Sequence, residues 1–191
     1  MQAARGASLT SDENTSTPLA DRRWRPRQLR LFVVVAVLGY LTDLGTKELA
    51  LARLDPQTTV PLVGDWLGLY LTFNSGAAFS LGTSYTFVLS VIAIAAAIAV
   101  LWTVRRLAST GWALGLGFLL AGVLGNLTDR IFREPSPMRG HVVDFVQLPN
   151  FPVFNVADIC INIAAGFIIL QAIRGMRVDG LRESDADQAE Q

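Results

Sequence analysis

Long apolar runs separated by short polar connections dominate the chain between residues 31 and 173. The clearest run, residues 85–104, has no charged side chain over twenty positions, enough for an α-helix to cross about 30 Å of hydrocarbon. Residues 112–132 and 151–173 are also long enough to span, although each carries polar residues near one end. The first candidate, about 31–51, starts as a clean apolar run and then contains three charged side chains. The pattern predicts an all-α membrane protein with four transmembrane helices.

The connection between the first two spans, about residues 55–84, has a different pattern. Thr59–Val63 and Leu67–Phe73 alternate or cluster β-forming residues between Gly and Pro positions. They predict a small extracytoplasmic β-sheet on the outer membrane surface, with Trp66 at the level of the lipid headgroups. The connection between the last two spans, about 133–150, is rich in Pro and Gly and is expected to be a flexible outer loop.

The arginines indicate how the four spans are oriented. Eleven of the fifteen Arg residues precede the first span, join the second to the third or follow the fourth, whereas three lie in the other connections. Cytoplasmic segments are enriched in Lys and Arg, so both termini are predicted to be cytoplasmic. Residues 1–24 and 176–191 are polar and are expected to be disordered extensions, which leaves 25–175 as the membrane domain.

A cleaved signal peptide is the rival interpretation of the first span. An Arg-rich start precedes a short apolar run, and Ala50-Leu51-Ala52 has the small-x-small form of a cleavage site. Three charged residues, Asp43, Lys47 and Glu48, stand between the apolar run and that site. Their presence favours a span that is kept and that uses these charges.

The composition limits the chemistry that the chain can perform. Hydrophobic residues make up 51% and charged residues 17% of the chain, and soluble domains have about 25% charged residues. The net charge is zero, so no basic face for nucleic acid is expected. A single Cys, Cys160, and a single His, His141, exclude an intrachain disulfide and the usual zinc ligand sets. No metal or cofactor is expected, and the chemistry must rely on carboxylates, amides, Arg or Lys.

Ionisable residues inside the predicted spans are the candidates for function, because they are costly there. With a rise of about 1.5 Å per residue, Asp43, Lys47, Asp129 and Asp158 all fall in the outer part of the bilayer. Asp43 and Lys47 stand at positions i and i+4, which suits an ion pair. Four ionisable groups from three predicted helices therefore share one layer.

Two of these carboxylates follow an asparagine at the same spacing. Asn126-x-x-Asp129 and Asn155-x-x-Asp158 each put an amide and a carboxylate on one helix face. Two carboxylates that meet in a low dielectric share a proton, as in aspartic proteases, where one activates water and the other protonates the carbonyl oxygen. The residues alone also allow a small proton- or cation-coupled transporter that uses these Asp residues, or a scaffold locked by buried polar groups.

Five short motifs occur in order across about residues 35–165. They are Asp43-Leu44-Gly45-Thr46-Lys47, Asn74–Phe79, Gly125–Arg130, Val142–Phe145 and Phe154–Asp158. With these motifs the chain resembles the prolipoprotein signal peptidases, also called signal peptidase II. The resemblance implies an aspartic endopeptidase of the bacterial inner membrane that removes the signal peptide of diacylglyceryl-modified prolipoproteins before the lipidated cysteine. It implies a prolipoprotein substrate, membrane lipids as surroundings and a monomeric enzyme with an extracytoplasmic active site.

The resemblance also implies a role for individual residues. By motif position, Asp129 and Asp158 would be the catalytic pair. Seven further residues would bind substrate or support the pair: Asp43, Lys47, Asn74, Gly122, Asn126, Arg130 and Asn155. Asp144, in the loop between the last two spans, is expected to fix that loop and to take no part in the chemistry. Leu44 departs from the Gln that the family often has there, which puts a polar contact from this position in doubt.

Within that set the expected contributions differ. Asn126 and Asn155 would orient the carboxylates or the water. Asn74, in the outer loop, and Arg130 would hold the substrate backbone. The pair of Asp43 and Lys47 would support the site, and Gly122 would allow close helix packing.

Overall fold

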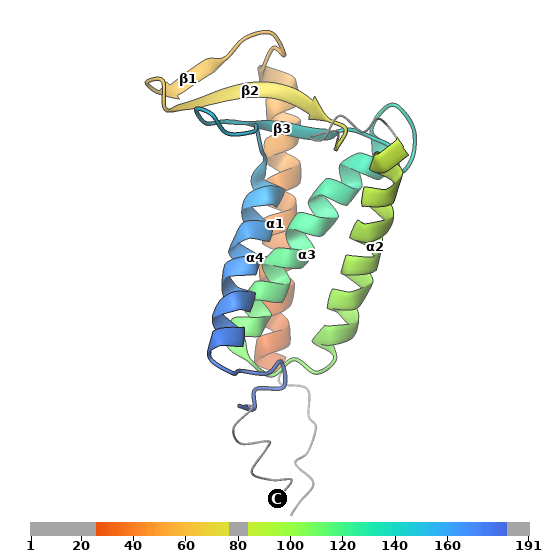
Figure 1. Ribbon diagram of the computed structural model, residues 1–191, viewed down its shortest axis with the longest axis vertical. Helices are drawn as coiled ribbons and strands as arrows, with labels where there is room; N and C mark the ends of the chain where they lie inside the picture. The colour runs from red at the N-terminus through yellow and green to blue at the C-terminus, as the bar shows by residue number, and fades with distance from the viewer. Residues whose placement is uncertain (1–25, 77–83, 183–191) are drawn as a thin grey trace, which may run out of the picture.

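The computed structural model describes residues 26–76 and 84–182. Its four long helices are α1 (Pro26–Arg53), α2 (Ser84–Val104), α3 (Thr110–Phe132) and α4 (Val156–Ile173). Each is long and apolar enough to cross a membrane, and together they form one elongated bundle (Figure 1). The predicted four spans are confirmed. The expected N-terminal extension, residues 1–24, lies outside the described residues.

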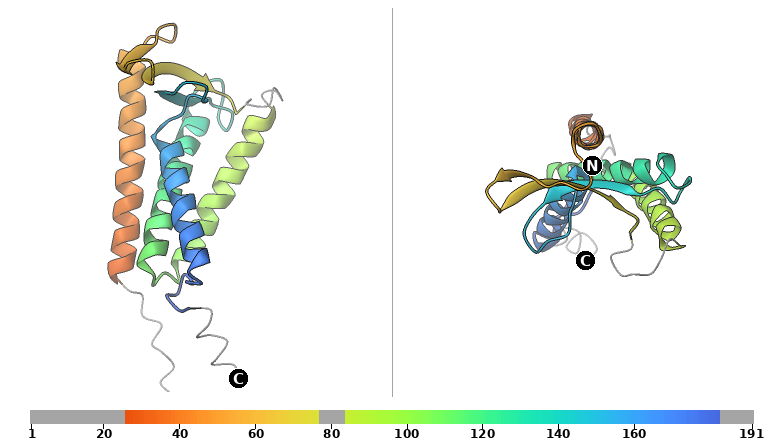
Figure 2. Two further views of the ribbon diagram at one scale, coloured as in Figure 1. Left: turned by 60° about the vertical axis from the view of Figure 1, so that its left-hand side comes forward. Right: turned by 90° about the horizontal axis from the view of Figure 1, so that it is seen from above.

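Helix α3 is the central element of the bundle. In the most apolar window of α3, 61% of the residues are buried, whereas the corresponding windows of the other three helices are 17% to 22% buried. It packs against α1, α2 and α4, as the two views in Figure 2 illustrate. A side chain at Gly122 would collide with Ala157 O and would meet Ile161 Cγ1 at 2.6 Å, so this glycine permits the close approach of α3 and α4.

A three-stranded antiparallel sheet lies across one end of the helices (Figure 1). It consists of β1 (Val60–Val63), β2 (Leu67–Asn74) and β3 (Val142–Gln147), in that spatial order. The first two strands agree with the small sheet that the sequence predicts. Ala50, at the end of α1, is buried in one cluster with residues of β2 and β3, and this contact fastens the sheet to the bundle.

The third strand comes from the segment that was expected to be a flexible loop. Residues 142–147 pair with β2, and Val143 is fully buried. The loop prediction was therefore wrong for these residues. The Pro and Gly residues at 135–140 do lie in a connection without a strand. The β-forming run that follows them was included in the predicted loop because its partner strand is distant in the sequence.

The opposite end of the bundle holds the start of α1 and the end of α4 (Figure 1). Here the chain after α4 has a defined structure up to residue 182, the last described residue. Met176 pairs with Arg182 in a β-bridge, and Val178 O accepts hydrogen bonds from the N–H groups of Ala108 at 2.9 Å and Ser109 at 3.2 Å. The expectation of disorder was wrong for residues 176–182, because this segment folds back under the connection between α2 and α3. The remainder, 183–191, lies outside the described residues.

Candidate active site

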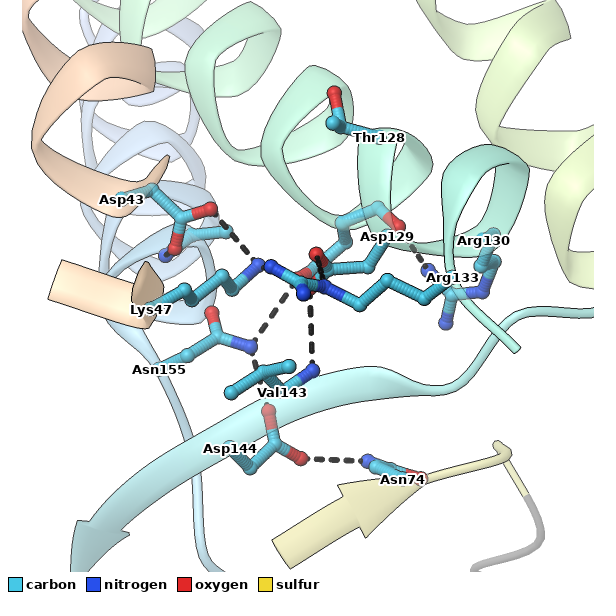
Figure 3. A network of polar contacts seen from close by, with 12 residues as sticks. Asp43, Lys47, Asn74, Thr128, Asp129, Arg130, Arg133, Val143, Asp144 and Asn155 are labelled. Atoms are coloured by element: carbon cyan, nitrogen blue, oxygen red, sulfur yellow. Dashed lines mark hydrogen bonds and ion pairs between the residues drawn. The ribbon is translucent and has the colours of Figure 1, made fainter. Parts of the chain in front are cut away.

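Polar residues from three helices meet at the sheet end of the bundle (Figure 3). Asp43 and Lys47 come from α1, Asp129 from α3, and Asn155 from the start of α4. The side chains of Asp43, Lys47 and Asp129 are each at most 1% exposed. The structure thus joins in one network the residues that the sequence analysis placed in one layer of the membrane.

Lys47 lies at the centre of this network and is fully buried. Its Nζ is 2.8 Å from Asp43 Oδ2, 2.9 Å from Asp129 Oδ2 and 3.0 Å from Asn126 Oδ1. The predicted pair with Asp43 is confirmed, and Asp129 is a second carboxylate partner. An ammonium has three donors, and all three have acceptors here, which is how a buried charge is tolerated.

Asp43 ties α1 to the beginning of α4. Its Oδ1 accepts a hydrogen bond of 2.8 Å from the backbone N–H of Ala157, in the first turn of α4. A carboxylate is favourable at a helix N-terminus, where backbone N–H groups lack helical partners. Gly125 of α3 leaves the space for this carboxylate, because a Cβ there would collide with it. Asp43 therefore connects Lys47 of α1 to the first turn of α4.

Asp129 is held on both of its carboxylate oxygens. Arg133 Nε donates to Oδ1, and Oδ2 receives Lys47 together with the backbone N–H of Val143 at 3.1 Å. Asp129 thus contacts two cations and anchors strand β3 to the end of α3. Neither oxygen is left without a protein donor, an arrangement that suits a structural carboxylate.

Asn155 and Asp158 form the start of α4. The helix begins at Val156 and not at the expected residue 151, so Asn155 is its N-cap and Asp158 its third residue. Asn155 Oδ1 accepts from the Asp158 N–H at 3.0 Å, and Asp158 Oδ2 accepts from the Asn155 N–H at 3.2 Å. This reciprocal capping box explains the Asn-x-x-Asp spacing at this position, which the sequence analysis interpreted as one helix face.

The same asparagine also contacts Asp144 of β3. Asn155 Nδ2 donates to Asp144 Oδ1 at 2.5 Å and to Asn126 Oδ1 at 3.1 Å. Asn126 Nδ2 in turn donates to Asp158 Oδ1 at 2.9 Å. Asp144 and Asp158 are therefore hydrogen-bonded to one residue, Asn155, and both contact neutral amides, whereas Asp129 contacts cations.

Asp144 is a site residue whose importance the sequence analysis missed. It is 1% exposed, and burial raises its pKa from 3.8 to about 6. This pKa is a balance: burial and the negative charge of Asp158 raise it, whereas hydrogen bonds from Asn74 and Asn155 and the charge of Lys47 lower it. Asp144 belongs to one of the five motifs, Val142–Phe145, which was the available indication. The surrounding Pro and Gly residues instead suggested that Asp144 only fixes a loop.

Asn74 and Arg130 border this carboxylate. Asn74, at the exposed end of β2, donates from Nδ2 to Asp144 Oδ2 at 2.9 Å. Arg130 is half-buried at the end of α3, where its Nη1 donates to Asn126 O at 3.3 Å. The buried Nε of Arg130 has no hydrogen-bond partner among the described residues. Both side chains thus offer donors at the edge of the carboxylate cluster.

Arg133 also contacts this network, and no sequence pattern singled it out. Its Nη2 donates to Glu48 Oε1 at 2.8 Å, in addition to the contact of its Nε with Asp129. Burial lowers the pKa of Arg133, but its hydrogen bonds to Asp129 and Glu48 outweigh this effect and raise the pKa. The spacing of four residues from Asp129 was the available signal.

Replacing Arg133 by Gln is expected to lower the free energy of unfolding by about 2 kcal/mol, because Asp129 is buried and loses a charged hydrogen-bond donor. Glu48→Gln breaks only the outer pair, in which Glu48 is 61% exposed, and is expected to cost less than about 1 kcal/mol. Denaturant unfolding in one detergent measures both variants. Equal costs for R133Q and E48Q would contradict a special role for the Asp129 contact.

The raised pKa of Asp144 predicts a pH dependence of stability. Because the folded pKa, about 6, exceeds the ordinary value of 3.8, the stabilising contribution is complete below 3.8 and is lost as the pH rises through about 6. The Tm of the protein is therefore expected to decrease between about pH 4 and pH 6 and to level off at higher pH. Asp144→Asn should remove this part of the decrease, whereas Asp65→Asn, at an exposed turn, should retain it. An identical pH profile for D144N and wild type would contradict the assignment.

Fold and site together define a four-span membrane protein with a carboxylate cluster at one end of its bundle. Within the described residues, no group of three or more His, Cys, Asp or Glu side chains could hold a metal ion. The family model of signal peptidase (SPase) II matches residues 35–174. The chain belongs to the signal peptidase II family, and it is an aspartic endopeptidase of the bacterial cytoplasmic membrane.

Individual relatives agree with this family. A protein of Mycobacterium avium (strain 104) named lipoprotein signal peptidase is 46% identical over 182 residues, which cover 95% of this chain and 99% of the relative. One of Mycobacterium leprae (strain Br4923) with the same name is 46% identical over 164 residues, covering 85% and 82%. A solved bacterial membrane enzyme aligns with a TM-score of 0.67 and 25% identity, covering 75% of this chain and 92% of its own. The comparisons give no support to a transporter.

Proposed function

We propose that the protein removes the signal peptide of diacylglyceryl-modified prolipoproteins by cleaving the peptide bond before the lipidated cysteine. The name shared by the relatives, lipoprotein signal peptidase, supports this class of substrate. The observation that carries the proposal is that one residue at the sheet end of the bundle, Asn155, donates hydrogen bonds to two carboxylates, Asp144 and Asp158. Such a pair provides an acid and a base for hydrolysis without a nucleophilic side chain.

The proposed catalytic pair is Asp144 with Asp158, in place of the Asp129 and Asp158 pair that motif position suggested. The ammonium of Lys47 and the amide of Asn126 connect Asp129 to Asp158, so those two carboxylates do not share a direct partner. Asp129 also contacts a second cation, Arg133, so both of its carboxylate oxygens are engaged in ion pairs with side chains of the protein. The two assignments remain competing predictions, and Asn variants of the three Asp residues distinguish them.

In the proposed reaction Asp158 acts as the base and Asp144 as the acid. Asp158 takes a proton from a water molecule as its oxygen attacks the scissile carbonyl carbon, and protonated Asp144 donates to the carbonyl oxygen. As the tetrahedral intermediate collapses, the carbon–nitrogen bond breaks and Asp158 passes the proton that it took from water to the leaving amine. Asp144 takes back its proton from the former carbonyl oxygen as the C=O bond of the new carboxyl group forms. The half-buried position of Asp158 gives water access, and the pKa of Asp144, about 6, favours its role as the proton holder.

The surroundings of the pair suit a lipid-anchored substrate. The sheet beside the site exposes apolar side chains, with Val63 60% and Trp66 71% exposed, as is suitable for a surface that rests among headgroups. Asn74 and Arg130 supply donors for the substrate backbone. A precursor whose acyl chains lie in the outer leaflet would thus bring its scissile bond to the level of the carboxylates.

This function requires a defined topology. The concentration of Arg at the end of the bundle opposite to the sheet supports cytoplasmic termini and an extracytoplasmic site. One chain supplies all the residues proposed for the site, so a monomer in membrane lipid is sufficient.

Cleavage of a defined precursor tests the proposal. The full chain, purified in detergent, is incubated with a diacylglyceryl prolipoprotein, and the shortened product is detected on a gel. The matched control is the same precursor without the diacylglyceryl group. We expect rapid cleavage of the lipidated form and at least about tenfold slower cleavage of the control, because acyl chain binding positions the bond. Failure to cleave the lipidated precursor would overturn the proposal.

A further inference from the structure

A cavity lies at the end of the bundle opposite to the proposed active site. It has a volume of about 380 Å³ and lies between the ends of α2 and α4, the start of α3 and the segment 175–179. Two tryptophans and two arginines are prominent in its lining: Trp102, Arg106, Trp112 and Arg177. None of these residues takes part in the carboxylate network, so the cavity is independent of the proposed chemistry.

The tryptophans give this cavity a defined form. Trp112 Nε1 donates to Met176 O at 2.7 Å, which fixes the segment after α4 against the start of α3. Trp102, at the end of α2, is 60% exposed, and the guanidinium carbon of Arg106 lies 5.5 Å from its ring centroid. This cation–π contact orients Arg106 without neutralising its charge.

The charge around the cavity is predominantly positive. Arg106 and Arg177 line it, and Arg105 and Arg174 flank it on the ends of α2 and α4. Asp179 is the acidic residue in the lining, and its contact with Arg177 is an exposed pair at 3.2 Å, which contributes little. In residues 26–76 and 84–182, no ion pair involves Arg106.

We propose that this cavity binds the phosphate group of an anionic phospholipid. Arg106 and Arg177 would donate to the phosphate oxygens, for which the planar guanidinium is well suited. Trp102 would lie at the level of the glycerol backbone, where membrane proteins place this side chain. The acyl chains would continue along the apolar outer face of α2, where Ile98 and Leu101 are 62% and 53% exposed.

A lipid is favoured over a free phosphate because Trp102, which lines the cavity, is one helical turn from the exposed Ile98 on the same face of α2. The cavity lies at the end of a membrane span, which is the depth of the headgroups. The Arg-rich end is also the side that faces the anionic cytoplasmic leaflet in the proposed topology. The inferred site is separate from substrate cleavage, and its failure would leave the proposed peptidase function intact.

Native mass spectrometry of the full chain measures this binding, with dioleoyl phosphatidylglycerol and dioleoyl phosphatidylcholine as probes. We expect wild type to retain phosphatidylglycerol roughly tenfold more tightly than phosphatidylcholine, and R106Q/R177Q to lose this preference. The matched control is R53Q/R139Q, which removes two exposed Arg residues near the sheet end. It should keep the preference, and both double variants should cleave prolipoprotein in phosphatidylcholine at the wild-type rate.

Three results would overturn the inference. One is an unchanged preference in R106Q/R177Q, and another is an equal loss in R53Q/R139Q, which would indicate unspecific attraction to charge. The third is displacement of phosphatidylglycerol by inorganic phosphate at equal concentration, which would identify a free anion as the ligand. If R106Q/R177Q does not fold, the single variants R106K and R106Q decide the matter, because only R106Q should lose the preference.

Discussion

Replacing either Asp144 or Asp158 by Asn is expected to decrease kcat for prolipoprotein cleavage by about 10²- to 10⁴-fold, because each would remove one partner of an acid–base pair. Both variants should remain folded, since Asn retains the size of Asp and the neighbours Asn155 and Asn74 are neutral amides. Cleavage assays with the lipidated precursor, combined with Tm measurements in the same detergent, provide the test.

Asp129→Asn is the matched control for this prediction. It should lower the Tm, since Asp129 neutralises Lys47 and Arg133 and holds Val143 of β3. Its loss of kcat should be smaller than that of D144N, and the folded fraction should cleave. If D129N is stable and inactive while D144N cleaves, the catalytic pair is Asp129 with Asp158, as motif position suggested.

Lys47→Met is expected to decrease the free energy of unfolding by about 3 to 5 kcal/mol, which is the usual cost of removing one partner of a buried ion pair and leaving the other charge unpaired. The variant would leave the carboxylates of Asp43 and Asp129 buried without their shared cation, and Asn126 Oδ1 would lose a donor. Denaturant unfolding in detergent measures this effect. The size of the loss follows from burial, because Lys47 is completely inaccessible.

Two further variants make this prediction specific. Arg53→Met removes a cation from the exposed end of the same helix and should change the unfolding free energy by less than about 0.5 kcal/mol. Asp43→Asn in the K47M background should recover part of the loss, because it removes one of the unpaired charges. An unfolding free energy that is the same for K47M and wild type would show that Lys47 does not stabilise the cluster.

The different surroundings of Asp129 and Asp158 illustrate why motif and spacing do not predict the contacts of the site. Asp129 and Asp158 follow asparagines at one spacing, and this repeat suggested that they are equivalent. In the structure Asp129 lies near the end of α3 between the cations of Lys47 and Arg133. Asp158 belongs to a capping box, which forms because α4 begins at Val156. Helix ends are set by capping and packing, which a run of apolar residues does not specify.

Strand β3 is the second feature that sequence could not predict. In its pairing with β2, Asp144 lies opposite Thr72. These two residues are far apart in the chain. The local pattern contains a β-forming run at 142–147, but the Pro and Gly residues before it favoured a loop and nothing local indicates its partner strand. Burial of Val143 against Leu71 in one apolar cluster with Ala50 stabilises the strand, and this contact depends on the whole bundle.

The sequence by itself determined the four membrane spans, the small sheet after the first span and the residue types that carry the chemistry. These are local properties, because about 20 consecutive apolar residues specify a span wherever they occur. Only the tertiary structure decided which carboxylate shares the donor Asn155 with Asp158 and which one is held by Lys47 and Arg133. The physical reason is that charge and hydrogen-bond partners come from distant segments, and their positions follow from how α3, α4 and β3 pack together.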